Sequence, residues 1–193
     1  MTLTVRRPLL LILAATLLLT GCSSLGGTGD QGFVTGDGQV TRLAVDDRGS
    51  RIDYEGEDLE GDPLALSEYR GAPVVVVVWG SWCGPCRAEA PDVVAAAQAL
   101  QGEAEMVGLN IRDSSPASAQ AFVRTFDVPY RSFYSPDGKA MLPFSGTLTP
   151  NSIPSFVVLD EDGRVAASII GELPSTDTLV ELTRDVADGT GRG

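Results

Sequence analysis

The chain has 193 residues, with 26 acidic and 14 basic side chains and a formal net charge of −12. It contains three cysteines and no histidine, which excludes Ser-His-Asp and Cys-His nucleophile systems and every histidine-ligated metal or haem site. Three thiols cannot complete a four-cysteine zinc or iron–sulfur site, so we expect no metal and no other cofactor. The negative charge repels phosphate backbones and argues against nucleic-acid binding.

The N-terminus has the features of an export signal. Arg6 and Arg7 precede an apolar run from Leu9 to Leu19, and small residues follow that run. As a helix the run would span about 16 Å, roughly half of a bilayer core, so a stable transmembrane helix is not expected. Residues 1–21 are therefore predicted to be a signal peptide that is removed on export.

The end of this signal resembles the bacterial lipobox. The sequence Leu19-Thr20-Gly21-Cys22 fits that pattern, in which the cysteine is lipidated on sulfur and becomes the new N-terminus; the alternative is an ordinary secretory signal with an incidental cysteine. Residues 22–38 are rich in glycine and polar side chains and are predicted to be the lipidated, flexible tether. We expect a protein held at the outer face of the cytoplasmic membrane through Cys22.

A globular domain is predicted from residue 39 to residue 189. Segments 40–45 and 51–66 predict short strands and turns, and segment 67–71 predicts one helical turn. Five consecutive valines, Val74–Val78, predict a strand that is buried on both faces, because no polar residue alternates with them. A helix is expected from Cys83 to about residue 100, with a kink at Pro91.

The second half of the domain continues the alternation of strands and helices. In chain order the sequence predicts a strand at 105–111, a helix at 116–126 capped by Ser114 or Ser115, an extended piece at 130–134, a turn at 135–138, a hairpin of 155–160 with 164–170, and a final helix from 175 or 176 to about 188. This order predicts an α/β domain with a central mixed sheet of four or five strands and helices on both faces.

The motif Trp82-Cys83-Gly84-Pro85-Cys86 lies where the valine strand gives way to a helix. The sulfur of Cys83 is expected at the helix N-terminus, where unpaired N–H groups and the helix dipole stabilise a thiolate. Cys86 lies one turn further on, close enough to attack a mixed disulfide formed at Cys83. Pro85 supplies a helix-compatible φ, and Gly84 leaves room for a partner's backbone. A disulfide across so short a loop would constrain the unfolded chain little, so a redox role is predicted.

The motif after its β-branched strand resembles thioredoxin, and Arg87-Ala88-Glu89-Ala90-Pro91 resembles the TlpA/ResA branch of exported thioredoxin-like proteins. The resemblance covers about residues 50–188 and implies a thioredoxin-like fold with thiol–disulfide oxidoreductase activity. It also implies a cis peptide bond at Ile153–Pro154, beside the cysteines, where the backbone of Ile153 would pair with substrate. The loop 139–152 precedes this proline, and its residues do not indicate which partners it selects.

The resemblance further implies that Glu89 is a buried carboxylate that tunes the cysteine pair and relays protons, although a glutamate on a helix is by itself usually solvated. Thioredoxin carries a buried aspartate six residues before its first cysteine. This chain has Val77 at that position, so Glu89 is the remaining candidate on this helix. Trp82 is expected to shield the disulfide and shape a docking surface, and Trp79 to pack in the core.

The predicted reaction is thiol–disulfide exchange, in which the Cys83 thiolate attacks a partner disulfide and Cys86 resolves the mixed disulfide. The Gly-Pro dipeptide matches thioredoxin, a reductant at about −270 mV, and favours a reductase. The resemblance implies a membrane thiol donor of the CcdA or DsbD type and oxidised exported proteins as substrates, including the CxxCH segments of apocytochromes c. We expect a monomer. The alternatives are an oxidase that introduces disulfides into exported proteins and a lipid-tethered binding module with a structural CxxC.

Overall fold

The computed structural model of the protein describes residues 38–189. The predicted signal peptide, the lipidation of Cys22 and the tether up to residue 37 lie outside the described residues. Gly38, the last residue assigned to the tether, is the first residue of strand β1. In the part of the chain that the structure describes, no helix has the length and apolar character needed to cross a membrane.

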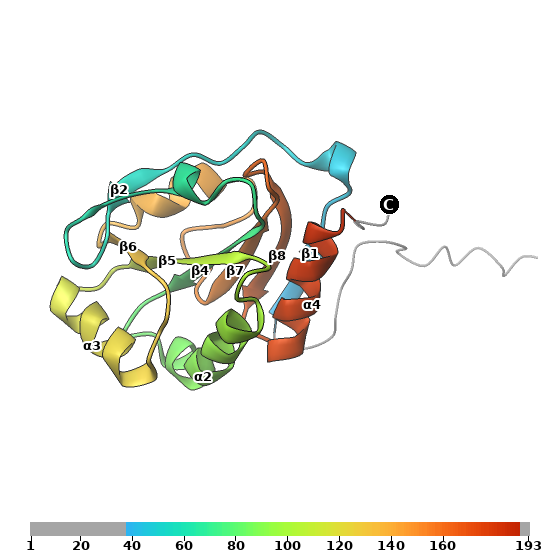
Figure 1. Cartoon of the computed structure of the whole chain (residues 1–193). Coiled ribbons are helices and arrows are strands. Elements are labelled where there is room, and N and C mark those ends of the chain that lie inside the picture. The colour runs from blue at the N-terminus through green and yellow to red at the C-terminus, as the bar shows by residue number, and fades with distance from the viewer. Residues whose placement is uncertain (1–37, 190–193) are drawn as a thin grey trace, which may run out of the picture. The chain divides into compact units, whose positions relative to one another are not determined.

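A mixed sheet of six strands lies at the centre of the described residues, in the order β1-β8-β7-β4-β5-β6 (Figure 1). Its strands are β1 (Gly38–Arg42), β4 (Val74–Trp79), β5 (Glu105–Ile111), β6 (Ser132–Ser135), β7 (Ser155–Leu159) and β8 (Val165–Gly171). Strands β4, β5 and β6 are parallel, whereas β7, β8 and β1 pair antiparallel with their neighbours. A separate hairpin pairs β2 (Glu55–Glu57) with β3 (Pro63–Ala65).

Residues 38–189 also contain three α-helices and three short 3-10 helices. They are α2 (Gly84–Ala99), α3 (Pro116–Phe126), α4 (Thr176–Ala187), η1 (Val45–Asp47), η2 (Leu66–Tyr69) and η3 (Lys139–Phe144). The hydroxyls of Ser115 and Ser175 cap α3 and α4, each accepting a hydrogen bond from the backbone N–H three residues further on. These caps satisfy N–H groups that have no partner within the helix.

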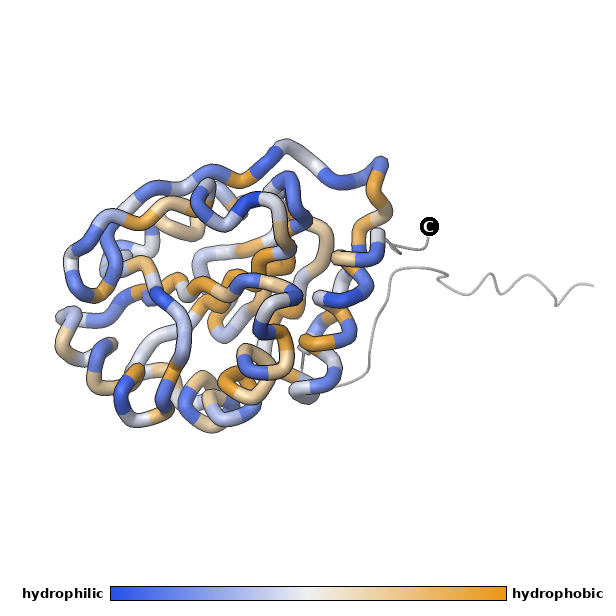
Figure 2. The backbone as a smooth tube through the Cα atoms, in the orientation of Figure 1, coloured by the Kyte–Doolittle hydropathy of each residue, from blue (hydrophilic) through white to orange (hydrophobic). Residues whose placement is uncertain are grey.

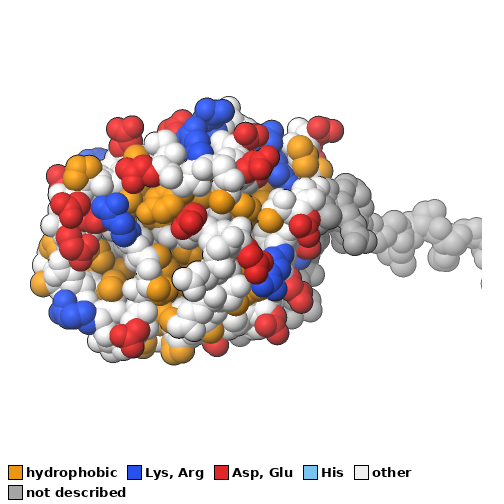
Figure 3. Space-filling view, in the orientation of Figure 1, with side chains coloured by type: hydrophobic (Ala, Val, Ile, Leu, Met, Phe, Trp, Pro, Cys, Tyr) orange, Lys and Arg blue, Asp and Glu red, His pale blue; other side chains and the backbone are white. Residues whose placement is uncertain are grey.

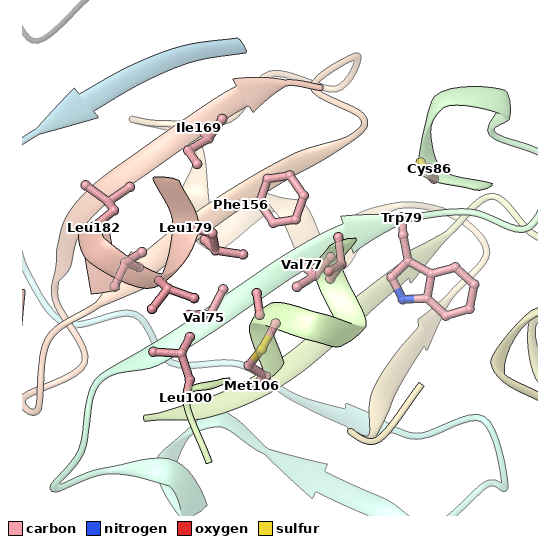
Figure 4. Close-up of a cluster of buried hydrophobic side chains, with 14 of the residues drawn as sticks. Val75, Val77, Trp79, Cys86, Leu100, Met106, Phe156, Ile169, Leu179 and Leu182 are labelled. Atoms are coloured by element: carbon pink, nitrogen blue, oxygen red, sulfur yellow. The ribbon is translucent and has the colours of Figure 1, made fainter. Parts of the chain in front are cut away.

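The valine strand β4 is buried on both faces because different elements cover its two sides. Val75, Val77 and Trp79 pack in the cluster that includes residues of α2, α3 and α4, part of which is drawn in Figure 4. Val74, Val76 and Val78 pack with the hairpin, η2 and η3. Figure 1 shows the α-helices and the β2 hairpin on opposite sides of the sheet, and Figure 2 shows the apolar strands inside and the polar loops outside.

The predicted thioredoxin-like α/β fold is confirmed, with two differences in detail. The sheet has six strands because residues 38–42 add to its edge by pairing with β8. Helices cover both faces, but the three α-helices of the described residues lie on one face, and the 3-10 helices η2 and η3 lie on the other. One of these, η3, lies in the segment that the sequence predicts as a loop. It starts after Gly138, which adopts φ 71°, and it forms because Ala140, Met141 and Phe144 are buried against the sheet.

Candidate active site

The two cysteines of the motif form a disulfide at the start of α2. Cys83 is the N-cap residue of this helix, and its sulfur accepts a hydrogen bond from the backbone N–H of Cys86 at 3.2 Å. The Cα atoms of the pair lie 5.3 Å apart, and the first turn of the helix contains no acidic residue. Because a helix N-terminus and a directed N–H both favour negative charge, this position stabilises the thiolate of Cys83 once the disulfide is reduced.

The loop before the disulfide packs closely against the end of β5. Trp82 is 50% exposed, and its indole N–H donates to the carbonyl of Ile111 at 3.2 Å. Gly80 lies under the indole, since a Cβ at this position would come within 2.6 Å of the Trp82 Nε1. Gly84 has open space where its Cβ would lie. The indole therefore stands beside the disulfide, while the first turn of α2 leaves room for an approaching backbone.

The Ile153–Pro154 peptide bond is cis. The residue after it, Ser155, pairs with Val78 at the end of β4, so the proline lies at the edge of the sheet from which the cysteine loop departs. The N–H of Ile153 donates to the carbonyl of Asn151 at 2.9 Å. Within the described residues the Ile153 carbonyl accepts no backbone hydrogen bond, so this carbonyl is the group that remains for pairing with an extended partner.

Glu89 lies one turn after Cys86, and both residues line a small cavity of about 20 Å³, room for a single water molecule. Val77 and Tyr130 are also among its walls. Burial raises the pKa of Glu89 to about 7, against the lowering effect of the Leu173 N–H, which donates to Oε2 at 2.8 Å. The charges of Glu172 and Asp92 raise this pKa further. The carboxyl group can therefore gain or lose a proton near neutral pH beside the second cysteine.

Tyr130 is a member of this cavity that the sequence did not indicate. Burial, and secondarily the charge of Glu89, holds the pKa of its hydroxyl well above the usual range, so the phenol stays protonated. Val77 supplies an apolar wall at the position where thioredoxin has an aspartate. Tyr130 follows a proline in a loop, and nothing in its local sequence pattern points to the cysteines.

Asp113, like Tyr130, was not indicated by the sequence, and it holds the loop in front of the disulfide. Asp113 is 3% exposed, and its carboxylate accepts hydrogen bonds from the Ser81 N–H at 2.9 Å, from the Ser81 hydroxyl and from the Asn110 amide at 2.6 Å. The Tyr134 hydroxyl donates to the backbone carbonyl of Asp113 at 3.2 Å. Because Ser81 lies two residues before Cys83, this carboxylate fixes the path by which the chain enters α2.

The structure thus assembles most of the residues singled out in the sequence. Cys83 and Cys86 are bonded, Glu89 shares a cavity with Cys86, and Trp82 is exposed beside the pair. Trp79 is buried, and its indole N–H donates to the hydroxyl of Ser132 at 3.2 Å. A disulfide at the start of a helix, after the central strand of a mixed sheet and beside a cis-proline, defines a thiol–disulfide oxidoreductase of thioredoxin-like fold.

Comparison with known proteins gives the family. A sequence model of the Redoxin family matches residues 45–185, and the chain belongs to this family. The thiol:disulfide interchange protein HelX of Rhodobacter capsulatus is 30% identical over 129 residues, which cover 66% of this chain and 69% of HelX. The thiol-disulfide oxidoreductase ResA of Bacillus cereus is 26% identical over 163 residues, which cover 84% of this chain and 88% of ResA.

Solved structures with the same fold include two from corynebacteria. A DsbF homologue from Corynebacterium diphtheriae has a TM-score of 0.71 at 30% identity, over 76% of this chain and 92% of that one. A secreted thiol-disulfide isomerase from Corynebacterium glutamicum has a TM-score of 0.72 at 28% identity, over 77% of this chain and 92% of that one. The chain is therefore a thiol–disulfide oxidoreductase of the TlpA/ResA type.

Proposed function

We propose that this oxidoreductase is anchored outside the cytoplasmic membrane and reduces disulfides of exported proteins, with Cys83 as the attacking thiolate and Cys86 as the resolving thiol. The observation that carries the proposal is the position of the Cys83 sulfur, which caps α2 and accepts the N–H of Cys86. The cis bond before Pro154, at the adjoining end of β7, supports a role for Ile153 and Pro154 in substrate binding.

The exchange consists of two displacements at sulfur. In the first, the Cys83 thiolate bonds to one sulfur of the partner disulfide, and the other partner sulfur leaves as a thiolate and takes a proton. In the second, Cys86 loses its proton and attacks the Cys83 sulfur, which forms the intramolecular disulfide and releases the second partner thiolate. The partner disulfide is reduced and the Cys83–Cys86 pair is oxidised, so the electrons balance. An external thiol donor then reduces the pair again.

Glu89 is proposed to accept and return the proton of Cys86. Its carboxyl group lines the same small cavity as Cys86, and burial raises its pKa to about 7. A base is most effective when its pKa is near the working pH. Trp82, Gly84 and Pro85 support the pair, because the exposed indole screens one side of the disulfide while the first turn of α2 leaves the other side open.

The sequence supports the cellular part of the proposal. The lipobox-like Leu19-Thr20-Gly21-Cys22 favours a lipid anchor on Cys22 after removal of residues 1–21, with residues 22–37 as tether and a redox domain that begins with strand β1 at Gly38. One structural relative is named as a secreted protein. We propose a membrane thiol donor of the CcdA or DsbD type, oxidised exported proteins as substrates (apocytochromes c among them) and a monomeric enzyme.

Reduction is proposed as the direction because Gly84 and Pro85 form the dipeptide of thioredoxin. A redox titration of the Cys83–Cys86 pair tests this direction. A potential near about −270 mV would support the reductase, whereas a potential near about −120 mV would indicate an oxidase that introduces disulfides.

The two cysteine roles are tested by trapping partners in cell envelopes. With Cys86→Ser the second displacement is blocked, so we expect mixed disulfides between Cys83 and partner proteins to accumulate, visible as reductant-sensitive adducts on non-reducing gels. Cys83→Ser is the matched control and should give no such adducts. If both variants retain partners equally and without covalent adducts, the chain is a binding module with a structural CxxC and the proposal is wrong.

A further inference from the structure

A cleft of about 390 Å³ opens at the same edge of the sheet as the disulfide. Strands β4, β5 and β6 are parallel, so their carboxyl ends meet at one edge. Cys83 follows β4, Arg112 follows β5 directly, and the turn 136–138 follows β6. In open α/β sheets, ligands bind in the crevice outside the carboxyl ends of the strands. The cleft therefore lies along the edge where chemistry takes place, displaced from the disulfide by one to two strands.

The walls of the cleft are mostly apolar and come from η3 and the loop that leads to the cis-proline. Its lining includes Arg112, Lys139, Met141, Leu142, Leu148 and Pro150. Leu142 is 66% exposed, and together with Trp82 and Val45 it is one of three large apolar side chains that are exposed in the described part of the chain. Leu142 shares the lining of the cleft with Met141, Leu148 and Pro150, and a contiguous apolar surface with a polar rim is the kind that binds a partner.

Arg112 connects this cleft to the active site. Its guanidinium donates a hydrogen bond to the carbonyl of Pro150, in the loop that ends at the cis bond. The preceding residue, Ile111, accepts the indole N–H of Trp82 at 3.2 Å. The chain from Trp82 through Arg112 to Pro150 is thus a continuous series of contacts, with the disulfide beside one end and the cleft beside the other.

Three charged side chains line the cleft, Arg112, Lys139 and Asp137, and only Arg112 is left without an ion pair among the described residues. No ion pair among residues 38–189 involves Arg112, whereas Lys139 pairs with Asp137 at 2.7 Å. Arg112 adopts φ 58°, a left-handed conformation that is uncommon for a residue with a side chain. Guanidinium groups prefer planar carboxylates. In a chain with a net charge of −12, a fixed guanidinium without a carboxylate partner favours an acidic group on an incoming molecule.

Figure 3 shows acidic and basic side chains around apolar surface on the face it presents, and in the whole chain 26 acidic residues outnumber 14 basic ones. A partner that carries many carboxylates would be repelled by such a surface. The complementarity at Arg112 therefore favours a short segment with a local carboxylate and not a strongly acidic protein.

We propose that the cleft is a docking subsite for an extended segment of the substrate protein. This segment adjoins the substrate cysteine whose sulfur is attacked by Cys83. An apolar side chain of that segment packs against Leu142 and Met141, and a neighbouring carboxylate pairs with Arg112. This proposal rests on the proposed exchange function and adds to it a class of substrate, segments in which acidic and apolar residues flank the disulfide.

The test uses the full-length protein, reduced beforehand and freed of reductant. Its second-order exchange rate is measured with disulfide-linked peptides whose cysteine is flanked on both sides by Glu and Leu, by Lys and Leu, or by Glu and Ser. Each peptide rate is divided by the rate with bis(2-hydroxyethyl) disulfide, which is small and neutral. We expect the Glu-and-Leu peptide to react about fivefold faster than either of the others. A rate difference of this size is what one exposed ion pair or one partly buried leucine produces.

Two substitutions and their controls isolate the subsite. Arg112→Glu should reverse the preference between the Glu and Lys peptides, and Leu142→Ser should remove the preference for leucine over serine. Arg124→Glu changes an exposed arginine that forms no ion pair within residues 38–189, and Val45→Ser changes an exposed valine. Both residues lie outside the cleft, so these variants should leave every ratio unchanged. Equal ratios for all peptides in the unsubstituted protein would overturn the docking subsite alone. Failure to exchange even with the small disulfide would overturn the proposed function as well.

Discussion

The two carboxylates near the disulfide differ in how they are bound. Asp113 binds the loop that leads into the cysteine motif; it is almost fully buried and its carboxylate accepts three hydrogen bonds. Glu89, after the cysteines along α2, is half-buried and accepts one backbone hydrogen bond, from Leu173. A carboxylate whose oxygens are all occupied by donors holds its neighbours in place. A carboxylate with a single donor beside a cavity is available for proton exchange.

This difference assigns the two sides of the active site to different tasks. The Asp113 side, with Ser81, Asn110 and the indole of Trp82, sets where the chain enters α2. The Glu89 side, with Tyr130 and Val77, sets the environment of Cys86. Substitutions on the first side should therefore act on stability and geometry, and substitutions on the second side should act on pH dependence.

The largest effect is expected from Asp113→Ala. It leaves the partly buried Ser81 N–H and the buried Asn110 amide without an acceptor, and should lower the free energy of unfolding by about 3 kcal/mol. Urea unfolding of the oxidised protein measures this loss. Asp113→Asn is the control, because its Oδ1 can accept the same two N–H groups while its Nδ2 donates to the Ser81 hydroxyl. An equal loss for both variants would show that the charge, and not the hydrogen bonds, holds the loop.

A smaller loss is expected from Gly80→Ala. The new Cβ would lie 2.6 Å from the Trp82 Nε1 and 3.1 Å from the Ile111 carbonyl oxygen, so the indole must move, at a cost of about 2 kcal/mol. Gly84→Ala, in the same segment, meets nothing within 4 Å and should change stability by less than about 0.5 kcal/mol. Thermal unfolding and the fluorescence of Trp82 distinguish the two. Similar losses would contradict the close packing of the indole on Gly80.

The smallest effect concerns Glu89 and depends on pH. Because the pKa of Glu89 is raised from 4.5 to about 7 in the folded protein, the folded state holds a proton that the unfolded state has lost between these values. The free energy of unfolding should therefore fall as the pH rises through this window, by about 1–2 kcal/mol after allowance for solvent screening.

Glu89→Gln removes this titration and keeps the shape of the side chain. Urea unfolding at pH 5 and pH 8 should show a smaller drop for the variant than for the unsubstituted oxidised protein. The reverse order, with a larger drop for the variant, would mean that Glu89 is not the group that titrates beside Cys86.

Much of the fold could be predicted because its signals are local. The block Val74–Val78 has no polar alternation, and the structure buries it on both faces. Ser115 and Ser175 mark the starts of α3 and α4 as N-caps. The six-stranded sheet was not predicted in full, because nothing in residues 38–42 indicates that they pair with β8, which lies more than a hundred residues away.

The site was predictable only where its residues are close in sequence. Cys83, Cys86 and Glu89 fall within two turns of one helix. Asp113 binds Ser81 across 32 positions, and Tyr130 reaches the cavity from a loop after α3. Such contacts depend on how the strands are ordered, and a single sequence carries no periodic signal for them. An aspartate soon after a buried strand, at the edge where the cysteine motif begins, is the one hint that could have been used.

The hydrogen bond from the Leu173 amide to Glu89 gives the protein an internal reporter of its protonation state. A backbone nitrogen that donates to a titrating carboxylate changes its magnetic environment when that group gains or loses a proton. The amide resonance of Leu173, in the loop between β8 and α4, would then report during turnover whether the carboxyl group of Glu89 is protonated.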